Sequence, residues 1–435
     1  MGAIYLKRAE KTPETLEDET QSIVKTMLTE IEAGGEPTAL DYARRLDRWD
    51  GDVVVTEAQR EAVRRSTPQA VKDDIAYAVD NVARFAEAQR GAMQGFEIEL
   101  QPGLFTGQVL RPMQSVGCYV PGGRYAHIAT AIMTIVTAKV AGVTSITACS
   151  PPRPGQGINP YILYTMDYCG ADRILAMGGV QGIAAMTYGL FGVPPVDILV
   201  GPGNRFVAEA KRILFGKVGI DVFAGPTEIA VIADATADAD VVAQDLASQA
   251  EHGLDSPAWL ITDDRALAEA VLARLPAVID RLPDGAAQTA RTAWREYGEV
   301  VLCDRREAMV EHSDRYAPEH LQVHCADLDW WLASLNNYGS LFLGEETTVA
   351  FGDKCSGPNH VLPTKGAARY TGGLSVAKFV KTLTYQRMAP DGVPEVAACA
   401  ARISRLEGME AHARSGDIRL AKYFPERAFN LRHPD

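Results

Sequence analysis

Apolar residues along the chain follow two periods, one typical of helices and one typical of strands. In residues 68–92 they recur every three or four positions, which predicts an amphipathic helix within a mostly helical region, 15–92. Apolar and polar residues then alternate through 96–100, which predicts a strand. The chain is therefore expected to begin with helices that lead into a β-rich stretch.

From residue 116 onward, short apolar runs alternate with glycine-containing turns and helical segments. The first series of predicted strands is VGCYV, SITAC, RILAM and DILVG, and the second is EIAVIAD, AWLIT, VVLCD and SLFLG. Repeated strand, turn and helix predict parallel α/β sheets, whose ligands gather at the carboxyl ends of the strands. The two series could be a duplicated pair. A turn-like stretch at 367–373 precedes a helical tail that is clearest over 393–412.

Charge and composition limit the classes of partner. The 435 residues carry a formal net charge of −13, which argues against a nucleic acid or an anionic membrane as the main partner. No apolar run reaches the ~18 residues of a membrane span, and the N-terminal stretch becomes charged too early for a signal peptide. Seven scattered Cys without a CxxC motif indicate neither a disulfide framework nor a thiolate zinc site. We expect a cytoplasmic protein.

Glycine-containing turns follow several predicted strands, but the chain has no GxGxxG dinucleotide motif. Glycine removes the side chain that would keep a phosphate away, so PGGR, MGGVQG and VGPGNR fit a nucleotide site. Their spacing alone favours the alternative, which is a tight connection between strand and helix.

Two short motifs combine an imidazole with a carboxylate or an amide. Gln249 and His252 are three positions apart on a predicted helix that Gly253 would cap. They fit a metal site, although sequence alone favours a His placed at a helix C-terminus for its dipole. Glu319 and His320 lie between apolar residues and fit either a general-base pair or a satisfied polar turn.

A third motif is the glycine-rich stretch 352–360, predicted as a loop after a strand. It contains Asp353, Lys354 and His360, and so polar a loop is typical of a functional site, with an Asx turn as the alternative. Near the end of the predicted tail, Glu407 and His412 are five apart, which is a poor spacing for one helix face.

Together these motifs offer amide, imidazole and carboxylate groups. A Gln, a His, an Asp and a distant His would make a mixed nitrogen and oxygen site that suits Zn²⁺. The remaining His residues have no carboxylate or amide in a comparable motif and are predicted to be core or surface residues: His127, His312, His324 and His433.

Seven specific strings occur in order: YVPGG at 119–123, GPGN at 201–204, AGPTE at 224–228, SQAEH at 248–252, APEHL at 317–321, GPNHVLPT at 357–364 and EGMEAH at 407–412. With these strings the chain resembles the histidinol dehydrogenase family from about Thr15 to Leu420. The resemblance implies an α/β homodimer with two incomplete Rossmann-like parallel-sheet domains, an N-terminal helical arm and a C-terminal helical domain. The implied boundaries are an arm at 1–18, a zinc-bearing and catalytic domain at 19–118 plus 227–370, a NAD-binding domain at 119–226 and a dimerisation domain at 371–435.

The resemblance also implies roles for individual residues. The implied zinc ligands are Gln249, His252, Asp353 and His412, and the implied NAD contacts are Tyr119, Gln181 and Asn204. Glu319 and His320 match the acid–base pair of the family. A partner subunit would supply His412 and Glu407. The implied reaction is a four-electron oxidation of a primary alcohol to a carboxylate through an enzyme-held aldehyde. In it, a neutral His320 takes the alcohol proton and Glu319 takes a proton from water.

Several positions depart from the family pattern. Lys354 follows Asp353 where Tyr is usual, Arg124 stands in the turn after YVPGG, and Thr227 replaces a Ser. The segment before Asp353, predicted as a strand, reads Thr347 to Ala350 where Pro-Glu is usual. A Lys beside a metal ligand suits an anionic small molecule better than the cationic amine of histidinol.

We therefore hypothesise a substrate with a sulfonate, 2,3-dihydroxypropane-1-sulfonate, oxidised to sulfolactate. The implied substrate contacts are Arg124, Thr227, Gln249, His252, His320, Asp353, Lys354, His360, Glu407 and His412. One alternative is L-histidinol, which Glu407 favours because in the family it helps to hold the imidazole. Another is a zinc-stabilised binding protein without catalysis, against which the presence of both Glu319 and His320 argues.

Overall fold

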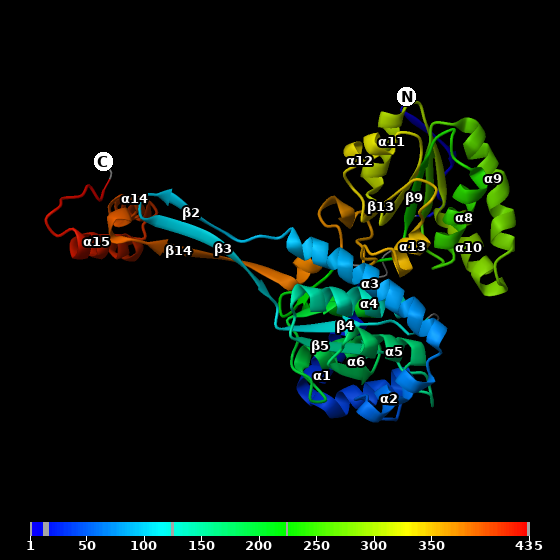
Figure 1. Cartoon of the computed structure of the whole chain (residues 1–435), viewed down its shortest axis with the longest axis horizontal. Coiled ribbons are helices and arrows are strands. Elements are labelled where there is room, and N and C mark those ends of the chain that lie inside the picture. Colours follow the sequence, from blue (N-terminus) through cyan, green and yellow to red (C-terminus); the bar gives the residue numbers. More distant parts are fainter. Residues whose placement is uncertain (1, 12–16, 123–125, 223–224, 433–435) are drawn as a thin grey trace. The chain divides into compact units, whose positions relative to one another are not determined.

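The structure is a computed structural model that describes residues 2–11, 17–122, 126–222 and 225–432. The chain divides into two compact units. The first comprises Met1–Arg90 and Met113–Phe379, and the second comprises Gly91–Pro112 and Val380–Asp435. Parallel sheets covered by helices confirm the predicted α/β class (Figure 1).

One sheet of the first unit has the strand order β1-β11-β10-β9-β12-β13. Its strands are β1 (Ala3–Lys7), β9 (Ile229–Ala233), β10 (Ala258–Thr262), β11 (Glu299–Cys303), β12 (His320–His324) and β13 (Ser340–Leu343). The edge strand β1 is antiparallel to β11 and the others are parallel. We call this the catalytic-side sheet.

The other sheet of the first unit has the order β6-β5-β4-β7-β8, and all its strands are parallel. They are β4 (Ser115–Tyr119), β5 (Ser145–Ser150), β6 (Arg173–Ala176), β7 (Ile198–Val200) and β8 (Gly219–Ile220). We call it the nucleotide-side sheet. With β9 and β4 counted as the first strands and β1 left out, each sheet has the Rossmann order 3-2-1-4-5. Two copies of one α/β unit would have this shared order.

The strand order reverses between β4 and β7, and this switch point is tightly packed. Gly201, directly after β7, has φ +110°, and a Cβ there would lie 2.1 Å from the carbonyl oxygen of Tyr119. Only glycine allows β7 to approach the end of β4 this closely. The space beyond these two strand ends stays open for a ligand.

Helices cover both faces of each sheet (Figure 1). Around the nucleotide-side sheet they are α1 (Glu17–Tyr42), α4 (Ile128–Ala141), α5 (Pro160–Cys169), α6 (Gly179–Tyr188) and α7 (Arg205–Leu214). Around the catalytic-side sheet they are α8 (Ala239–Ala250), α9 (Arg265–Asp280), α10 (Asp284–Tyr297), α11 (Arg306–Tyr316), α12 (Leu328–Ser334) and α13 (Val349–Lys354). The first unit also contains η1 (Ala43–Asp47), α2 (Glu57–Ser66), α3 (Gln69–Gly91), η2 (Ala367–Arg369) and η3 (Val376–Phe379).

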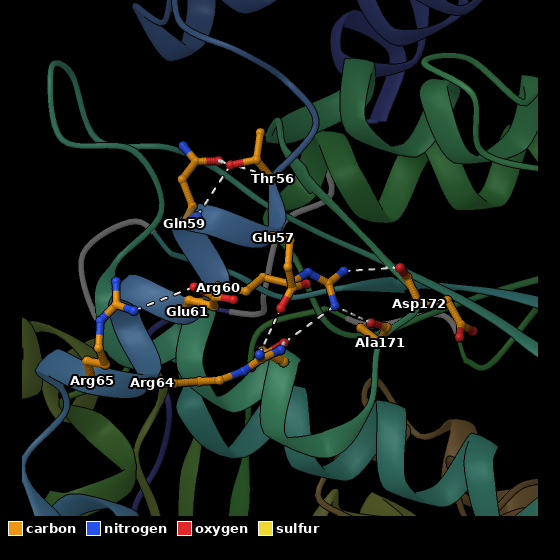
Figure 2. Close-up of polar contacts among 10 residues, drawn as sticks. Thr56, Glu57, Gln59, Arg60, Glu61, Arg64, Arg65, Ala171 and Asp172 are labelled. Carbon is orange, nitrogen blue, oxygen red and sulfur yellow. Dashed lines mark hydrogen bonds and ion pairs between the residues drawn. The ribbon is translucent and has the colours of Figure 1, made fainter.

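The segment after α1 is fixed to the nucleotide-side sheet. Arg64 on α2 forms a bidentate ion pair with the buried carboxylate of Asp167, at 2.6 and 2.8 Å. Arg60, drawn in Figure 2, donates to the carbonyl oxygens of Ala171 and Asp172 at 3.0 and 3.1 Å. Residues 53–55 also pair with β6 by backbone hydrogen bonds. These contacts hold the preceding turn, η1, beside the carboxyl ends of the strands.

The second unit consists of a three-stranded antiparallel sheet, β14-β3-β2, and a helical pair. Its elements are β2 (Phe96–Gln101), β3 (Leu104–Pro112), β14 (Val380–Met388), η4 (Pro390–Gly392), α14 (Val393–Leu406) and α15 (Glu410–Tyr423). Large apolar side chains remain exposed on both the sheet and the helices, among them Leu100 at 61%, Leu406 at 70% and Ile418 at 66%. Within the described ranges, no helix combines the length and apolar character that crossing a bilayer requires.

The structure corrects four local predictions. The segment before Asp353 is the helix α13, not a strand, and Asp353 and Lys354 form its last turn rather than a loop. The tail is two helices separated at Glu407–Met409, because Gly408 adopts φ +75°. Helix α8 ends at Ala250, so His252 lies just beyond it and Gly253 is not a left-handed cap. Strand β12, which His320 begins, was not predicted.

Candidate active site

A cavity of about 1530 Å³ in the first unit gathers most of the predicted site residues. From the nucleotide-side sheet its wall includes Tyr119 at the end of β4 and Pro202 after β7, which are carboxyl ends of strands. From the catalytic-side sheet it includes Thr227 before β9 and His320 at the start of β12, which are amino ends. The prediction that ligands gather at carboxyl ends thus fits only the nucleotide-side sheet. The cavity is larger than a pocket for one small molecule, typically ~300–1,000 Å³.

Glu319 and His320 form a buried pair at the start of β12. Their side chains are 9% and 4% exposed, and Glu319 Oε2 lies 3.5 Å from His320 Nδ1. His320 Nδ1 also lies 3.0 Å from the carbonyl oxygen of Glu228, which can only accept, so Nδ1 carries the hydrogen. His320 Nε2 has no hydrogen-bond partner within the described residues and lies 3.6 Å from Asp353 Oδ1. In a neutral ring this nitrogen holds the lone pair.

The carboxylates decide the protonation of His320 in this state. Burial lowers the pKa of His320, but Glu319 and Asp353 outweigh it and raise the pKa to about 9. Burial raises the pKa of Glu319, and His320 and Thr227 oppose that shift. With no metal cation beside Asp353, these carboxylates favour a protonated His320, and a neutral His320 stays a prediction for the metal-bound site. Lys354 is the cation paired with Asp353 here, with Nζ 3.7 Å from Oδ2.

Thr227 connects Glu319 to Gln249. Its hydroxyl donates to Glu319 Oε2 and accepts a hydrogen bond of 2.6 Å from Gln249 Nε2. Because the hydroxyl has only one hydrogen, Gln249 must present its amide nitrogen to Thr227. The carbonyl oxygen of Gln249 is therefore the atom left for another ligand.

Three of the four predicted zinc ligands line the cavity: Gln249, His252 and Asp353. His252 Nδ1 lies 3.0 Å from the carbonyl oxygen of Ser248, so its hydrogen is on Nδ1 and Nε2 is free to coordinate. In the part of the chain that the structure describes, no group of three or more His, Cys, Asp or Glu side chains could hold a metal. The chain places an amide oxygen, an imidazole and a carboxylate on the wall of one cavity.

Lys354 and His360 flank Asp353. Both line the cavity, and the side chain of Lys354 is 64% exposed. His360 Nδ1 lies 2.8 Å from the carbonyl oxygen of Asp353 and Nε2 lies 3.1 Å from Thr130 Oγ1. Burial lowers the pKa of His360, so it is a neutral ring that holds the end of α13 against α4.

The three predicted nucleotide contacts also line the cavity. The Tyr119 hydroxyl accepts from Gly179 N at 3.1 Å, and Asn204 Oδ1 caps α7, which leaves its Nδ2 for a ligand. Gln181 is 1% exposed, and its Oε1 has no partner among the described residues. These groups are consistent with a polar ligand on the nucleotide side.

Three predicted site residues are not part of this description of the first unit. Glu407 and His412 belong to the second unit, at the C-terminus of α14 and in the first turn of α15, and both are exposed. Arg124 is outside the described residues.

Sequence patterns missed several cavity groups. His127, predicted as a core or surface residue, lines the cavity at the N-terminus of α4, and burial lowers its pKa to about 4. Asp47 reaches the wall from η1. Glu228 lies buried behind the wall, where burial and the neighbouring Glu319 raise its pKa to about 8. Glu228 is the last residue of the AGPTE string, but no role was predicted for it, and nothing local marked Asp47.

The sequence profile of the histidinol dehydrogenase family matches residues 10–420. The chain belongs to the histidinol dehydrogenase family. Within this family, a sulfopropanediol 3-dehydrogenase of Ruegeria pomeroyi is 57% identical over 427 residues, 98% of either chain. A histidinol dehydrogenase homolog of Pelagibacter ubique is 58% identical over 424 residues, 97% of this chain and 99% of the relative.

The fold agrees with a solved structure of the family. The crystal structure of histidinol dehydrogenase from Elizabethkingia anophelis matches with a TM-score of 0.90 and 32% identity, covering 95% of both chains. The chain is accordingly an oxidoreductase of the histidinol dehydrogenase family that acts on CH–OH donors.

Proposed function

We propose that this enzyme is a zinc- and NAD-dependent dehydrogenase that oxidises a primary alcohol to a carboxylate through an aldehyde it keeps bound. The observation that carries the proposal is the buried Glu319–His320 pair, whose free Nε2 faces Asp353 in a cavity large enough for two ligands. Two proton-accepting groups side by side suit two successive oxidations, since each step must remove a proton from oxygen.

The donor set fits zinc. Hydrogen bonds turn the Gln249 amide and the His252 ring so that Oε1 and Nε2 stay free, and Asp353 adds a carboxylate. These are borderline ligands with open positions, as a catalytic zinc site requires. Bound there, zinc would polarise the substrate hydroxyl and orient it.

The nucleotide side of the cavity fits a dinucleotide. Tyr119, Gln181 and Asn204 present neutral polar groups near the switch point of a Rossmann-ordered sheet. NAD⁺ bound there would accept one hydride in each of the two oxidations.

The residues of the chain then act in turn on one substrate. If Asp353 held a cation, its negative charge would be offset and would no longer raise the pKa of His320, so Nε2 could take the proton of the alcohol. Glu319, held by Thr227 and by Glu228 N at 3.0 Å, takes a proton from the water that attacks the aldehyde. Keeping the aldehyde in a closed cavity prevents loss of a reactive carbonyl.

For the substrate we favour 2,3-dihydroxypropane-1-sulfonate, with sulfolactate as the product. The relative named sulfopropanediol 3-dehydrogenase is 57% identical, whereas the solved histidinol dehydrogenase is 32% identical. Lys354 supplies a cation at the mouth of the cavity that can pair with a sulfonate. The competing substrate is L-histidinol. Glu407 favours it, because a carboxylate can bind an imidazole or an amine.

We also propose that the enzyme is a homodimer in which a second copy completes each site with His412 and Glu407. The second unit supports this with its exposed apolar residues, including Leu406 and Ile418, since contiguous apolar surface marks an interface. The chain's own cavity offers three metal donors, and His412 would be the fourth.

A parallel assay tests the substrate. NADH production would be followed with dihydroxypropanesulfonate and with histidinol as the only alcohol, each at saturation with NAD⁺. We expect two NADH for each sulfonate and little turnover of histidinol. Faster turnover of histidinol would establish the competing activity, and no NADH with either compound, from zinc-loaded protein, would contradict the proposed dehydrogenase.

A further inference from the structure

Asp47 occupies an unusual place at the wall of the cavity. Its Oδ2 accepts two hydrogen bonds, from Gly178 N at 3.0 Å and from Gln181 Nε2 at 2.9 Å. No cation pairs with this carboxylate among the described residues, and burial raises its pKa. Its Oδ1 takes no hydrogen bond there, so the carboxylate keeps one free acceptor at the cavity.

Asp47 also fixes the polarity of Gln181. A carboxylate only accepts hydrogen bonds, so the amide nitrogen of Gln181 must face Asp47 and the carbonyl oxygen must face away. That Oε1 is buried and unpartnered within the described structure. Since a buried acceptor without a donor is costly, a bound ligand that supplies a donor would satisfy it. Asp47 and Gln181 thus offer two acceptor atoms without a partner among the described residues, Oδ1 and Oε1.

The same contacts occupy two backbone donors at the N-terminus of α6. In many dinucleotide folds the free N–H groups of a glycine turn hold a phosphate. Here Gly178 N is taken by Asp47 and Gly179 N by the Tyr119 hydroxyl. A phosphate at these two glycines would therefore meet a carboxylate and a hydroxyl in place of two free donors.

Asp47 lies close to the place where dinucleotide-binding sheets usually carry an acidic residue. A dinucleotide fold usually carries an acid at the end of its second strand, where it binds the ribose hydroxyls of NAD. Strand β5 is the second strand here, and it ends at Ser150 and Pro151 without an acid. A Cβ on Gly178 would lie 2.5 Å from Pro151 Cβ and 2.9 Å from Asp47 Oδ1. The N-terminal segment therefore delivers a carboxylate close to the end of β5.

We propose that Asp47 and Gln181 together bind the two hydroxyls of an unphosphorylated ribose and so select NAD over NADP. A vicinal diol offers two donors for the free Oδ1 and Oε1, whereas a 2′-phosphate brings negative charge to a carboxylate. The nearest cavity cation on the same segment is Arg45, which pairs with Asp41 at 3.5 Å and lies over the ring of Tyr42. This inference rests on the proposed NAD dependence.

Calorimetry on the zinc-loaded protein without alcohol tests the inference, with NAD⁺ and NADP⁺ as the probes. For the parent we expect NAD⁺ to bind at least about 10-fold more tightly than NADP⁺. Asp47→Asn can no longer fix the amide of Gln181 or repel a phosphate, so we expect weaker NAD⁺ binding and a smaller ratio between the two nucleotides. The matched control is Asp50→Asn, an exposed acid outside the cavity wall, which should keep both affinities.

A second variant separates a local effect from misfolding. In a Gln181→Ala background, Asp47→Asn should weaken NAD⁺ binding by less than it does in the parent, because part of its effect passes through the amide. An unchanged nucleotide ratio in Asp47→Asn, or equal binding of NADP⁺ by the parent, would overturn this inference while leaving the dehydrogenase proposal intact. Binding of neither nucleotide would overturn both.

Discussion

Gln249 Nε2 donates a 2.6 Å hydrogen bond to the hydroxyl of Thr227, and that hydroxyl donates in turn to Glu319. The direction of these bonds is fixed, because the carboxylate accepts only and the hydroxyl has one hydrogen. A single side chain therefore orients both a proposed metal ligand and a proposed base. Serine, usual at this place in the family, can make the same two bonds.

Replacement of Thr227 by Val should disturb both Gln249, the proposed metal ligand, and Glu319, the proposed base. Val keeps the shape of Thr but removes the hydroxyl, so the Gln249 amide can turn and Glu319 loses a donor. We expect zinc affinity to fall about 10- to 100-fold, as for other residues that orient metal ligands. Competition with a chelating indicator measures this affinity. Thr227→Ser is the control and should bind zinc like the parent, whereas tight zinc binding by Thr227→Val would show that Gln249 needs no such support.

Glu228 should make stability depend on pH. Burial and Glu319 raise its pKa from 4.5 to about 8, and its Oε1 accepts from Lys365 N at 3.0 Å. Between these values the folded carboxyl keeps a proton that the unfolded one has lost. Folding then binds a proton, so the contribution of Glu228 to stability is greatest below pH 4.5 and falls as the pH rises to about 8.

Glu228→Gln keeps the neutral shape of the protonated acid and should remove this dependence. We expect its melting temperature to exceed that of the parent more at a pH of about 8.5 than at about 5. Thermal unfolding at both values measures the difference. The exposed Glu87→Gln is a matched control and should show no such trend. An equal difference at both pH values would mean that Glu228 ionises normally.

The sequence predicted most of the fold because strands and helices in this chain alternate with a clear period. Most strands of both sheets follow from apolar runs such as those of β4 and β9, whereas β1, β8 and β12 were not predicted. The errors lie where tertiary contacts override a local pattern. Thr347, Thr348 and Val349 are β-branched and favour a strand, yet helix α13 begins at Val349. Its N-cap residue Thr348 donates to the carboxylate of Asp245 at 2.9 Å.

Only the site residues that belong to recognisable sequence motifs could be predicted. Glu319, His320 and Gln249 belong to strings that the family shares, and the cavity brings them together as expected. Asp47 has no motif, because its role depends on the pairing of residues 53–55 with β6, far away in sequence. The protonation of His320 could not be read from its neighbours in sequence either, since Asp353 meets it only in the folded chain.

Lys354 should act on the substrate and not on the nucleotide. Its side chain is 64% exposed, so water screens its charge, and loss of one ion pair should raise the KM for the sulfonate about two- to five-fold. Lys354→Ala tests this in steady-state assays with each substrate varied, and the KM for NAD⁺ should not change. Lys354→Arg keeps the positive charge, so its KM for the sulfonate should stay close to that of the parent. Lys25→Ala on α1 is the control for loss of one positive charge elsewhere. Unchanged kinetics in Lys354→Ala would exclude it as the partner of the anion.

Mixed dimers test whether a second copy completes the site. His252→Ala and His412→Ala should each be nearly inactive, because each lacks a proposed zinc ligand in both sites of its own dimer. A heterodimer of the two variants, isolated through different affinity tags, has one site with both changes and one site with neither. It should recover about half the parental activity if His412 comes from the partner, since an isologous dimer has two equivalent sites. If His412 served its own chain, both sites would carry a change and no activity would return. The matched control pairs His252→Ala with Asp353→Ala, two residues of the same cavity wall, and should stay inactive under either arrangement.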